Sequence, residues 1–180
     1  MMETPSPMAP LAAMLYPDLG SPEGLLAAFA AELQSRNLRI GGVLQTTSPR
    51  PGSIKGVMEL VDLAGGSRIA LSQDLGTGSS ACTLDLSALA QASVLVRQAV
   101  DQGCDLVIFN KFSHQERSGR GLAADIAYAA LRGVPVLTAL RPAASEDWAQ
   151  FTGGAGAVLA PEIAALRSWW LECQTANMAG

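Results

Sequence analysis

The sequence carries little charge. Charged residues make up only 16% of its 180 residues, whereas 49% are hydrophobic, and this balance excludes an intrinsically disordered chain. The net charge is −4 at pH 7 and the pI is about 4.9, which argues against a general nucleic-acid-binding protein, because such proteins usually present a basic face. Hydrophobic runs fall far short of the roughly 20 residues that cross a bilayer, so we expect no membrane partner.

Cysteine is also scarce. Cys82, Cys104 and Cys173 lie far apart and form neither a metal-binding motif nor an even-numbered disulfide framework. Such a pattern fits a reducing compartment, so we expect a cytoplasmic protein. The first ten residues contain three prolines and no basic cluster, which predicts a flexible tail over 1–10 rather than a signal peptide. A single domain over 11–175 should follow, because a chain of this length can bury a full core.

Short apolar runs alternate with helix-like segments along the chain. The expected strands are 11–16, 39–45, 106–109, 135–139 and 158–159, and the expected helices are 21–36, 85–101, 122–131, a short one from 145 and a terminal one from 161. The runs 57–63 and 68–72, joined by a glycine-rich turn, predict an antiparallel hairpin, and 46–56 is expected to be a loop. This order predicts an α/β fold, a three-layer sandwich with a mainly parallel sheet plus the hairpin.

Polar residues are densest directly after the apolar run 106–109. A strand, a polar loop and a helix in that order place ligands at the carboxyl end of a parallel sheet. Gln115 and Arg117 contribute to this polar stretch. The candidate ligand-binding residues in it are Asn110, Lys111, His114, Glu116, Gly119, Arg120 and Gly121.

A second polar, glycine-rich loop covers 73–80. Its candidate ligand-binding residues are Gln73, Asp74, Gly76, Gly78 and Ser79. The loops 17–21, 73–80 and 110–121 could meet at the carboxyl ends of the parallel strands, and the last two should face each other across one cleft. The alternative for 73–80 is a plain connection, since a glycine loop alone is weak evidence.

The loop after the first strand is where a nucleotide-binding α/β protein carries its phosphate loop, G-x-x-x-x-G-K-[ST]. The stretch 18–26 has no lysine for the phosphates and no hydroxyl after it for a metal ion. Ser21 should cap the following helix, with Pro22 at its first position and Glu23 in its first turn. Pro22 removes an N–H from the anion-binding end of the helix, and Glu23 would repel a phosphate.

A second departure follows the strand 106–109. Phosphate-hydrolysing proteins of this kind usually end such a strand in an acid that helps to hold Mg²⁺. Here Asn110 and Lys111 occupy the place, and neither supplies the negative charge. Lys111, Arg117 and Arg120 instead favour an oxyanion bound without magnesium, either a phosphate or a tetrahedral metal oxyanion. The alternatives are that these cations form a solvated surface and that His114 is an ordinary hydrogen-bonding residue.

The motif from Asn110 to Gly121 resembles the signature Asn-Lys-Phe-Gly-x-x-Glu-x-x-Gly-x-Gly of the bacterial DUF2478 family, with Ser113 at the first glycine. The stretches 73–76, 82–85 and 133–138 resemble the same family. The resemblance implies a P-loop-NTPase-like architecture, remotely similar to the THEP1-type nucleoside triphosphatases, without an intact phosphate loop. It also implies a link to molybdate uptake and molybdenum enzymes. The candidate ligands are molybdate or a nucleotide.

Three functions remain open from the sequence. The first is an oxyanion- or nucleotide-binding protein linked to molybdenum handling, without NTP hydrolysis. The second is a nucleoside triphosphatase with a remodelled phosphate site, and the third is an interaction scaffold that binds no ligand. The partners to expect are a small anionic ligand and either a second copy of the chain or a protein related to molybdenum enzymes.

Overall fold

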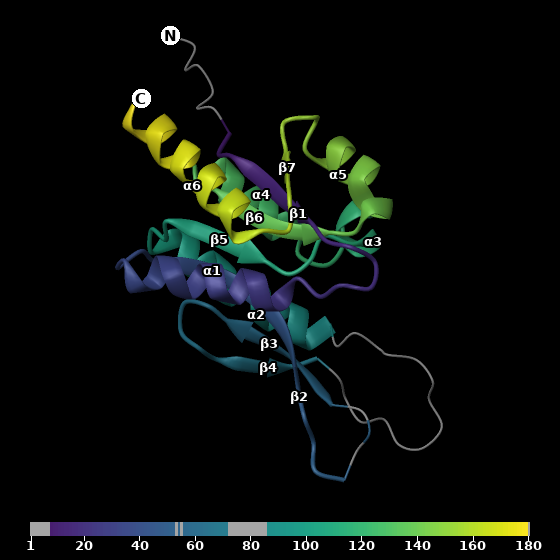
Figure 1. Ribbon diagram of the computed structural model, residues 1–180. Helices are drawn as coiled ribbons and strands as arrows, with labels where there is room; N and C mark the ends of the chain where they lie inside the picture. The colour runs from purple at the N-terminus through teal and green to yellow at the C-terminus, as the bar shows by residue number, and fades with distance from the viewer. Residues whose placement is uncertain (1–7, 53, 55, 72–85, 180) are drawn as a thin grey trace.

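The structure, a computed structural model, describes residues 8–52, 54, 56–71 and 86–179 (Figure 1). The strands are β1 (Leu11–Leu15), β2 (Ile40–Ser48), β3 (Val57–Asp62), β4 (Arg68–Ala70), β5 (Leu106–Phe109), β6 (Val136–Leu140) and β7 (Ala157–Leu159). The helices are α1 (Glu23–Ser35), α2 (Leu86–Asp101), α3 (His114–Arg117), α4 (Ala123–Leu131), α5 (Ser145–Phe151) and α6 (Ile163–Met178), and a 3₁₀ turn, η1 (Pro142–Ala144), precedes α5.

These strands form one sheet in the order β4-β3-β2-β5-β6-β1-β7. The pairs β2–β5, β5–β6, β6–β1 and β1–β7 are parallel, whereas β2–β3 and β3–β4 are antiparallel. The predicted α/β class, with a mainly parallel sheet and an antiparallel hairpin, is therefore confirmed. The carboxyl ends of β1, β5 and β6 lie next to one another because these strands are parallel neighbours.

Alternating side chains on the central strands divide the core between the two faces of the sheet. Val107 and Phe109 pack with the buried residues of α2 and α4, whereas Leu106 and Ile108 pack with those of α1 and α6. The three layers are visible in Figure 1, with α1 and α6 on the near side of the sheet. Period-two alternation on strands buried on both faces accounts for their unbroken apolar sequences.

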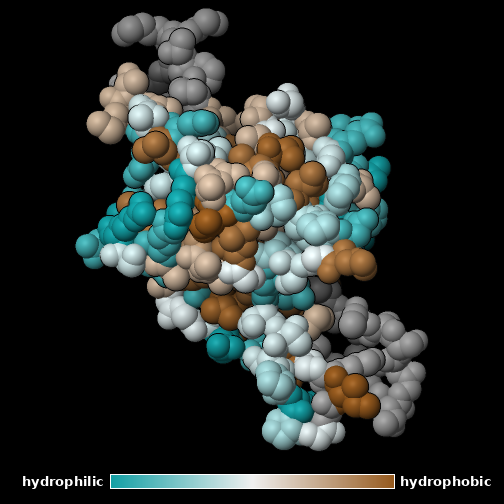
Figure 2. Space-filling model, in the orientation of Figure 1, coloured by the Kyte–Doolittle hydropathy of each residue, from teal (hydrophilic) through white to brown (hydrophobic). Residues whose placement is uncertain are grey.

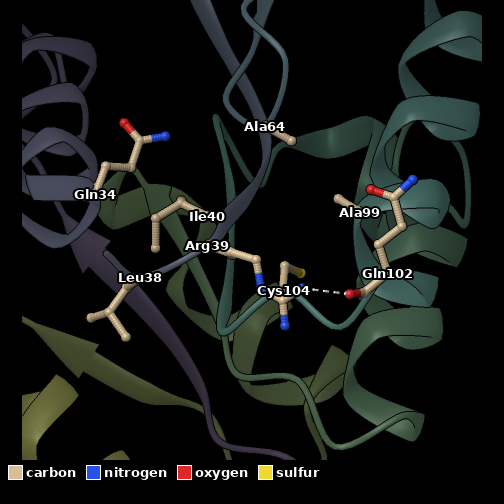
Figure 3. A pocket seen from close by; sticks show the side chains of 8 residues that line it. All are labelled: Gln34, Leu38, Arg39, Ile40, Ala64, Ala99, Gln102 and Cys104. Atoms are coloured by element: carbon tan, nitrogen blue, oxygen red, sulfur yellow. Dashed lines mark hydrogen bonds between the residues drawn. The ribbon is translucent and has the colours of Figure 1, made fainter. Parts of the chain in front are cut away.

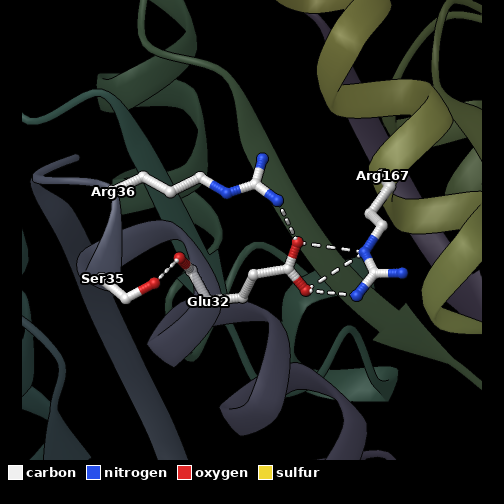
Figure 4. Close-up of polar contacts among 4 residues, drawn as sticks. All are labelled: Glu32, Ser35, Arg36 and Arg167. Carbon is white, nitrogen blue, oxygen red and sulfur yellow. Dashed lines mark hydrogen bonds and ion pairs between the residues drawn. The ribbon is translucent and has the colours of Figure 1, made fainter.

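The contact between α1 and α6 has a polar component at its exposed rim. Glu32 accepts hydrogen bonds from Arg167 at 2.7 Å and from Arg36, one helical turn further on, at 2.8 Å (Figure 4). Both guanidinium groups are largely exposed, so each ion pair contributes little to stability. Trp169 and Trp170 of α6 are buried in the core.

Two boundaries differ from the sequence prediction. Strand β2 continues through Thr46, Thr47 and Ser48 because these residues pair with β3, whereas the sequence predicts a loop there. The N-terminal tail predicted over 1–10 attaches to the domain before residue 10. Ala9 is buried and donates its N–H to the carbonyl of Ala130 at 3.2 Å. Residues 1–7 of that predicted tail lie outside the described residues.

The surface carries scattered apolar residues. Leu19, Leu131 and Leu171 are all well exposed but belong to different elements, and Figure 2 shows hydrophobic and hydrophilic residues interspersed over one face. Single exposed apolar side chains of this kind are ordinary. In the described part of the chain, no helix is both long enough and apolar enough to span a membrane.

Candidate functional site

Two of the three loops predicted to converge do meet at the carboxyl end of the sheet. Tyr16 follows β1 and donates its N–H to the carbonyl of Leu140 at 3.1 Å, and Phe112, in the loop after β5, donates to Ala139 at 2.8 Å. Asn110 donates its own N–H to the carbonyl of Val43 at 3.1 Å. Backbone hydrogen bonds to β2 and β6 therefore fix the start of the loop after β5. The third loop, with Gln73, Asp74, Gly76, Gly78 and Ser79, lies outside the described residues.

Glu23 links the first turn of α1 to the loop after β5. Its carboxylate accepts a hydrogen bond from the Ser21 hydroxyl and another from Nδ2 of Asn110 at 3.1 Å. Partial burial alone would raise the pKa of Glu23, but these hydrogen bonds and the charge of Lys111 outweigh it and lower the pKa. The carboxylate is therefore ionised at neutral pH. A negative charge also suits the amino end of a helix.

The start of α1 differs in detail from the prediction. Pro22, rather than Ser21, occupies the cap position, and its carbonyl accepts the first helical hydrogen bond from Leu26. No side chain caps the helix, since proline has no polar side-chain atom, and the Ser21 hydroxyl donates to Glu23. The chain's own carboxylate thus stands at the amino end of α1, where a phosphate loop would hold a phosphate.

Glu116 organises the loop that carries the candidate residues. One carboxylate oxygen accepts from the N–H and the hydroxyl of Ser113, at 3.0 and 2.6 Å, and the other accepts from the N–H of Leu122 at 3.3 Å. Ser113 in turn caps α3, which completes a capping box. Glu116 is 8% exposed. Although the sequence places Glu116 among the ligand-binding residues, the structure uses both its oxygens to hold the loop.

The predicted glycines serve the same loop. Gly119 and Gly121 both have positive φ, at 77° and 58°, a conformation that glycine adopts without steric cost. A Cβ on Gly121 would collide with the carboxylate of Glu116. Gly121 therefore lets the chain pass close to Glu116, which explains why Glu116 and Gly121 occur together in the motif.

An aromatic cluster anchors the other side of this loop. The ring of Phe112 lies edge-on to Trp148, with 5.3 Å between centroids, and 5.2 Å from the ring of Phe151. Phe112 and Trp148 are buried, so the residues on either side of Phe112 are held in place by apolar packing. The loop is thus held by apolar packing at Phe112 and by hydrogen bonds at Glu116, and Ser113 and His114 lie between them.

Lys111 borders a pocket of about 370 Å³ that we call the cation pocket. Its lining includes three cationic side chains, Lys111, Arg117 and Arg141, but only one carboxylate, Asp147. Arg117 pairs with Asp147 at 3.0 Å, whereas Arg141 lies 5.8 Å from the centre of the Tyr16 ring. Within the residues that the structure describes, neither Lys111 nor Arg141 pairs with a carboxylate. The positive charge left over favours an anion.

Arg120 and Lys111 line different pockets. Arg120 lines another pocket, of about 510 Å³, between α2, α3 and α4, while the exposed His114 borders both pockets. Arg97 lines this second pocket too, but its charge is compensated by the buried Asp125 at 2.8 Å. A clasp of one small anion by Lys111 and Arg120 together therefore receives no support from the pocket linings.

A further pocket, of about 270 Å³, lies at the opposite edge of the sheet, where β2 and β5 begin (Figure 3). Arg39 donates to the carbonyl of Gln102 at 2.9 Å, and Cys104 is buried beside them. Burial, followed by the charge of Asp105, raises the pKa of the Cys104 thiol to about 11. The thiol is therefore protonated at neutral pH and is a poor nucleophile.

Sequence reasoning missed Arg141 as a site residue. Arg141 directly follows β6, just as Asn110 directly follows β5, and the carboxyl ends of parallel neighbours share one edge. The predicted strand 135–139 ends one residue before β6 does, so the prediction does not place Arg141 directly after the strand. The same rule that selected Asn110 and Lys111 could have found Arg141.

Comparisons with known proteins give a family, a curated relative and a solved structure of similar fold. The family model described as "Protein of unknown function (DUF2478)" matches residues 11–169. A protein of Bradyrhizobium diazoefficiens named Molybdenum import ATP-binding protein ModC 2 is 42% identical over 160 residues, which are 89% of this chain but 18% of that protein. The solution structure of a human cancer-related nucleoside triphosphatase superimposes with a TM-score of 0.61 at 17% identity, covering 83% of this chain and 87% of that one. The latter likeness concerns the fold.

Proposed function

The chain belongs to the DUF2478 family, and from that premise we propose that it binds an oxyanion and serves molybdenum handling. The ligand occupies the cation pocket, and molybdate is the oxyanion that the proposal favours. No NTP hydrolysis accompanies the binding. The protein acts in the cytoplasm, as the pattern of three scattered cysteines leads us to expect.

The observation that carries the proposal is that Lys111 and Arg141 line one pocket and, among the described residues, neither forms an ion pair with a carboxylate, although Glu23 lies close enough to Lys111 for their charges to interact. Lys111 follows β5 and Arg141 follows β6, so adjacent parallel strands deliver both cations to one pocket. Arg117 adds a third cation whose charge Asp147 offsets. A guanidinium and an ammonium group both donate hydrogen bonds to oxyanions, and such charge-assisted bonds are about twice as strong as neutral ones.

The residues around the pocket favour binding over magnesium-dependent hydrolysis. Asn110 stands where an acid would help to hold the metal ion, and its Nδ2 is committed to Glu23. Glu23, in turn, brings negative charge to the amino end of α1, where a phosphate would otherwise be stabilised by backbone N–H groups. Neither residue suits the triphosphate chemistry that the fold supports elsewhere.

The link to molybdenum rests on the relative named Molybdenum import ATP-binding protein ModC 2. This chain spans only 18% of that protein, so the transport activity that its name describes does not by itself extend to this chain. We infer a partnership instead: the module acts with a protein of molybdenum import or with a molybdenum enzyme.

A ligand panel tests the proposal. Purified protein is titrated by isothermal calorimetry with molybdate, tungstate, sulfate and phosphate, and with ATP and GTP in the presence of Mg²⁺. Lys111→Ala is titrated alongside. Arg36→Ala is the matched control, because it also removes one positive charge but lies at the far end of α1, paired with Glu32 (Figure 4).

Saturable oxyanion binding that Lys111→Ala weakens and Arg36→Ala preserves supports the proposal. Preferential binding of a magnesium nucleotide with turnover would favour the remodelled triphosphatase. A protein that binds none of these ligands would be an interaction scaffold. In either of the last two cases the cation pocket is not an oxyanion site.

A further inference from the structure

A smaller pocket of about 220 Å³ lies on another side of the loop after β5, and we call it the amide pocket. Three carboxamide side chains line it, those of Gln45 on β2, Asn110 after β5 and Gln115 on α3. Leu60, Leu89 and Leu122 are among its apolar walls. Lys111 and Ser113 border both this pocket and the cation pocket, so the two are adjacent.

Asn110 presents an unsatisfied acceptor. Its Nδ2 donates to Oε1 of Glu23, and because an ionised carboxylate only accepts hydrogen bonds, this contact fixes which end of the amide is nitrogen. The Oδ1 atom is then buried without a hydrogen-bond partner among the described residues, in a side chain that is only 8% exposed. Buried acceptors in folded proteins are almost always paired, so a missing donor is implied at this position.

The other two carboxamides are available as well. Among the described residues, Gln45 donates its Nε2 only to the thioether of Met58, at 3.4 Å, and a thioether is a weak acceptor. The Gln115 side chain makes no hydrogen bond in the part of the chain described here, while its backbone N–H is used by the Ser113 cap. The side-chain amides of Gln45 and Gln115 each offer a carbonyl oxygen as acceptor next to an NH₂ donor. The pocket therefore presents neutral, paired hydrogen-bonding groups beside two charged side chains, Lys111 and Glu116, which also line it.

Size and lining together select the ligand. Pockets for drug-sized molecules usually measure about 300–1,000 Å³, so a pocket of about 220 Å³ takes a fragment such as one or two rings. Leucine walls favour a flat apolar face, and carboxamides read edges on which N–H donors and acceptors alternate, as they do on adenine in DNA recognition. We propose that the amide pocket binds a nucleobase, with Asn110 Oδ1 accepting from a ring or exocyclic N–H.

Lys111 then distinguishes two forms of this ligand. A nucleoside uses the amide pocket alone, whereas a nucleoside monophosphate also reaches Lys111 from the same side. The base-binding step does not depend on the oxyanion proposal. Only the extra affinity of the phosphorylated ligand rests on it, so the two proposals can fail separately.

The experiment titrates the protein with adenosine, guanosine, cytidine and uridine by calorimetry, and then with the 5′-monophosphate of the tightest binder. Gln45→Leu and Asn110→Leu remove one carboxamide each at nearly constant volume. Gln98→Leu, on the exposed face of α2, is the matched control. Urea unfolding of every variant confirms that it is folded. Loss of one neutral hydrogen bond should weaken nucleoside binding about threefold to tenfold.

The expected result is saturable binding of at least one nucleoside that both pocket variants weaken and Gln98→Leu preserves. If no nucleoside binds, the acceptor of Asn110 is satisfied by water alone and the inference is overturned. Nucleoside binding that Gln45→Leu and Asn110→Leu leave unchanged overturns it too. A monophosphate that binds no tighter than its nucleoside leaves the amide pocket intact and counts against the cation pocket.

Discussion

Nδ2 of Asn110 lies 3.1 Å from Oε1 of Glu23, and this hydrogen bond joins the loop after β5 to the first turn of α1. The contact has two consequences. It keeps a negative charge near Lys111, which acts against anions entering from solvent. It also turns the Asn110 carbonyl oxygen away from the carboxylate and leaves it without a partner in the described structure. One hydrogen bond thus shapes both pockets that border Lys111.

The first prediction concerns hydrolysis. The wild-type protein should release no phosphate from ATP or GTP with Mg²⁺ above the blank, because the loop 17–21 lacks the phosphate-loop lysine and Asn110 replaces the metal-binding acid. A coupled phosphate assay at saturating nucleotide measures the rate. Turnover of about 1 per second or faster, which is ordinary for enzymes, would contradict the prediction.

The second prediction separates two arginines. Arg141→Ala should weaken oxyanion binding roughly tenfold to a hundredfold, since a hydrogen bond to a charged group contributes about 1.5–3 kcal/mol. Arg120→Ala should leave the affinity unchanged, because Arg120 lines a different pocket from Lys111. Both side chains are exposed, so both variants should keep their stability within about 0.5 kcal/mol. If Arg120→Ala weakens oxyanion binding and Arg141→Ala does not, the anion binds between α2 and α4 instead.

The third prediction concerns the architecture of the loop. Gly121→Ala should lower the free energy of unfolding by about 1–3 kcal/mol, because alanine is strained at positive φ and its methyl group meets Glu116. Glu116→Ala should cost about 1–2 kcal/mol through loss of the capping box. Urea unfolding measures both. If Glu116→Ala is as stable as the wild type, Glu116 does not hold the loop and is again a candidate ligand-binding residue.

Much of the fold could be predicted because its signals are local. The strand 106–109 is an unbroken apolar run, and α2 shows helical spacing up to Asp101 with Gly103 just past its end, so their types and approximate bounds follow from the sequence. The extension of β2 through Thr46–Ser48 could not be read in the same way. Its strand conformation depends on pairing with β3, and the nearby prolines at 49 and 51 argue for a loop.

The candidate site was predicted in part for similar reasons. Lys111 and Asn110 follow a recognisable strand, so their place at the sheet edge could be inferred. Helix α3 is too short to show periodicity, although the pattern Ser113-x-x-Glu116 is a capping box that the sequence displays. That Glu116 turns inward depends on the N–H of Leu122, a contact made only when the loop closes.

The fourth prediction tests the opposing charge of Glu23. Glu23→Gln should strengthen oxyanion binding in the cation pocket about threefold to tenfold, because it removes a negative charge near Lys111 while keeping an acceptor for Asn110. Calorimetry with molybdate and with phosphate measures the change. Asp18→Asn, an exposed carboxylate on the loop before α1, controls for net charge alone. Equal gains in both variants would mean that Glu23 has no special position.

The last prediction follows from the lowered pKa of Glu23. A carboxyl group that titrates lower in the folded state stabilises that state above the unfolded value, about pH 4.3, and the stabilisation is lost as the pH falls through the folded pKa. Glu23 is half-buried, so the effect on stability is modest. At pH 6 the wild type should melt about 1–3 °C above Glu23→Gln, and this difference in Tm should disappear as the pH falls to 3. Ser21→Ala removes one donor to the carboxylate and should move this loss to higher pH. Thermal unfolding at half-unit pH steps, with carbon NMR of the Glu23 carboxyl, measures both shifts. A Tm difference that is independent of pH would mean that the Ser21 and Asn110 hydrogen bonds do not stabilise the charged form.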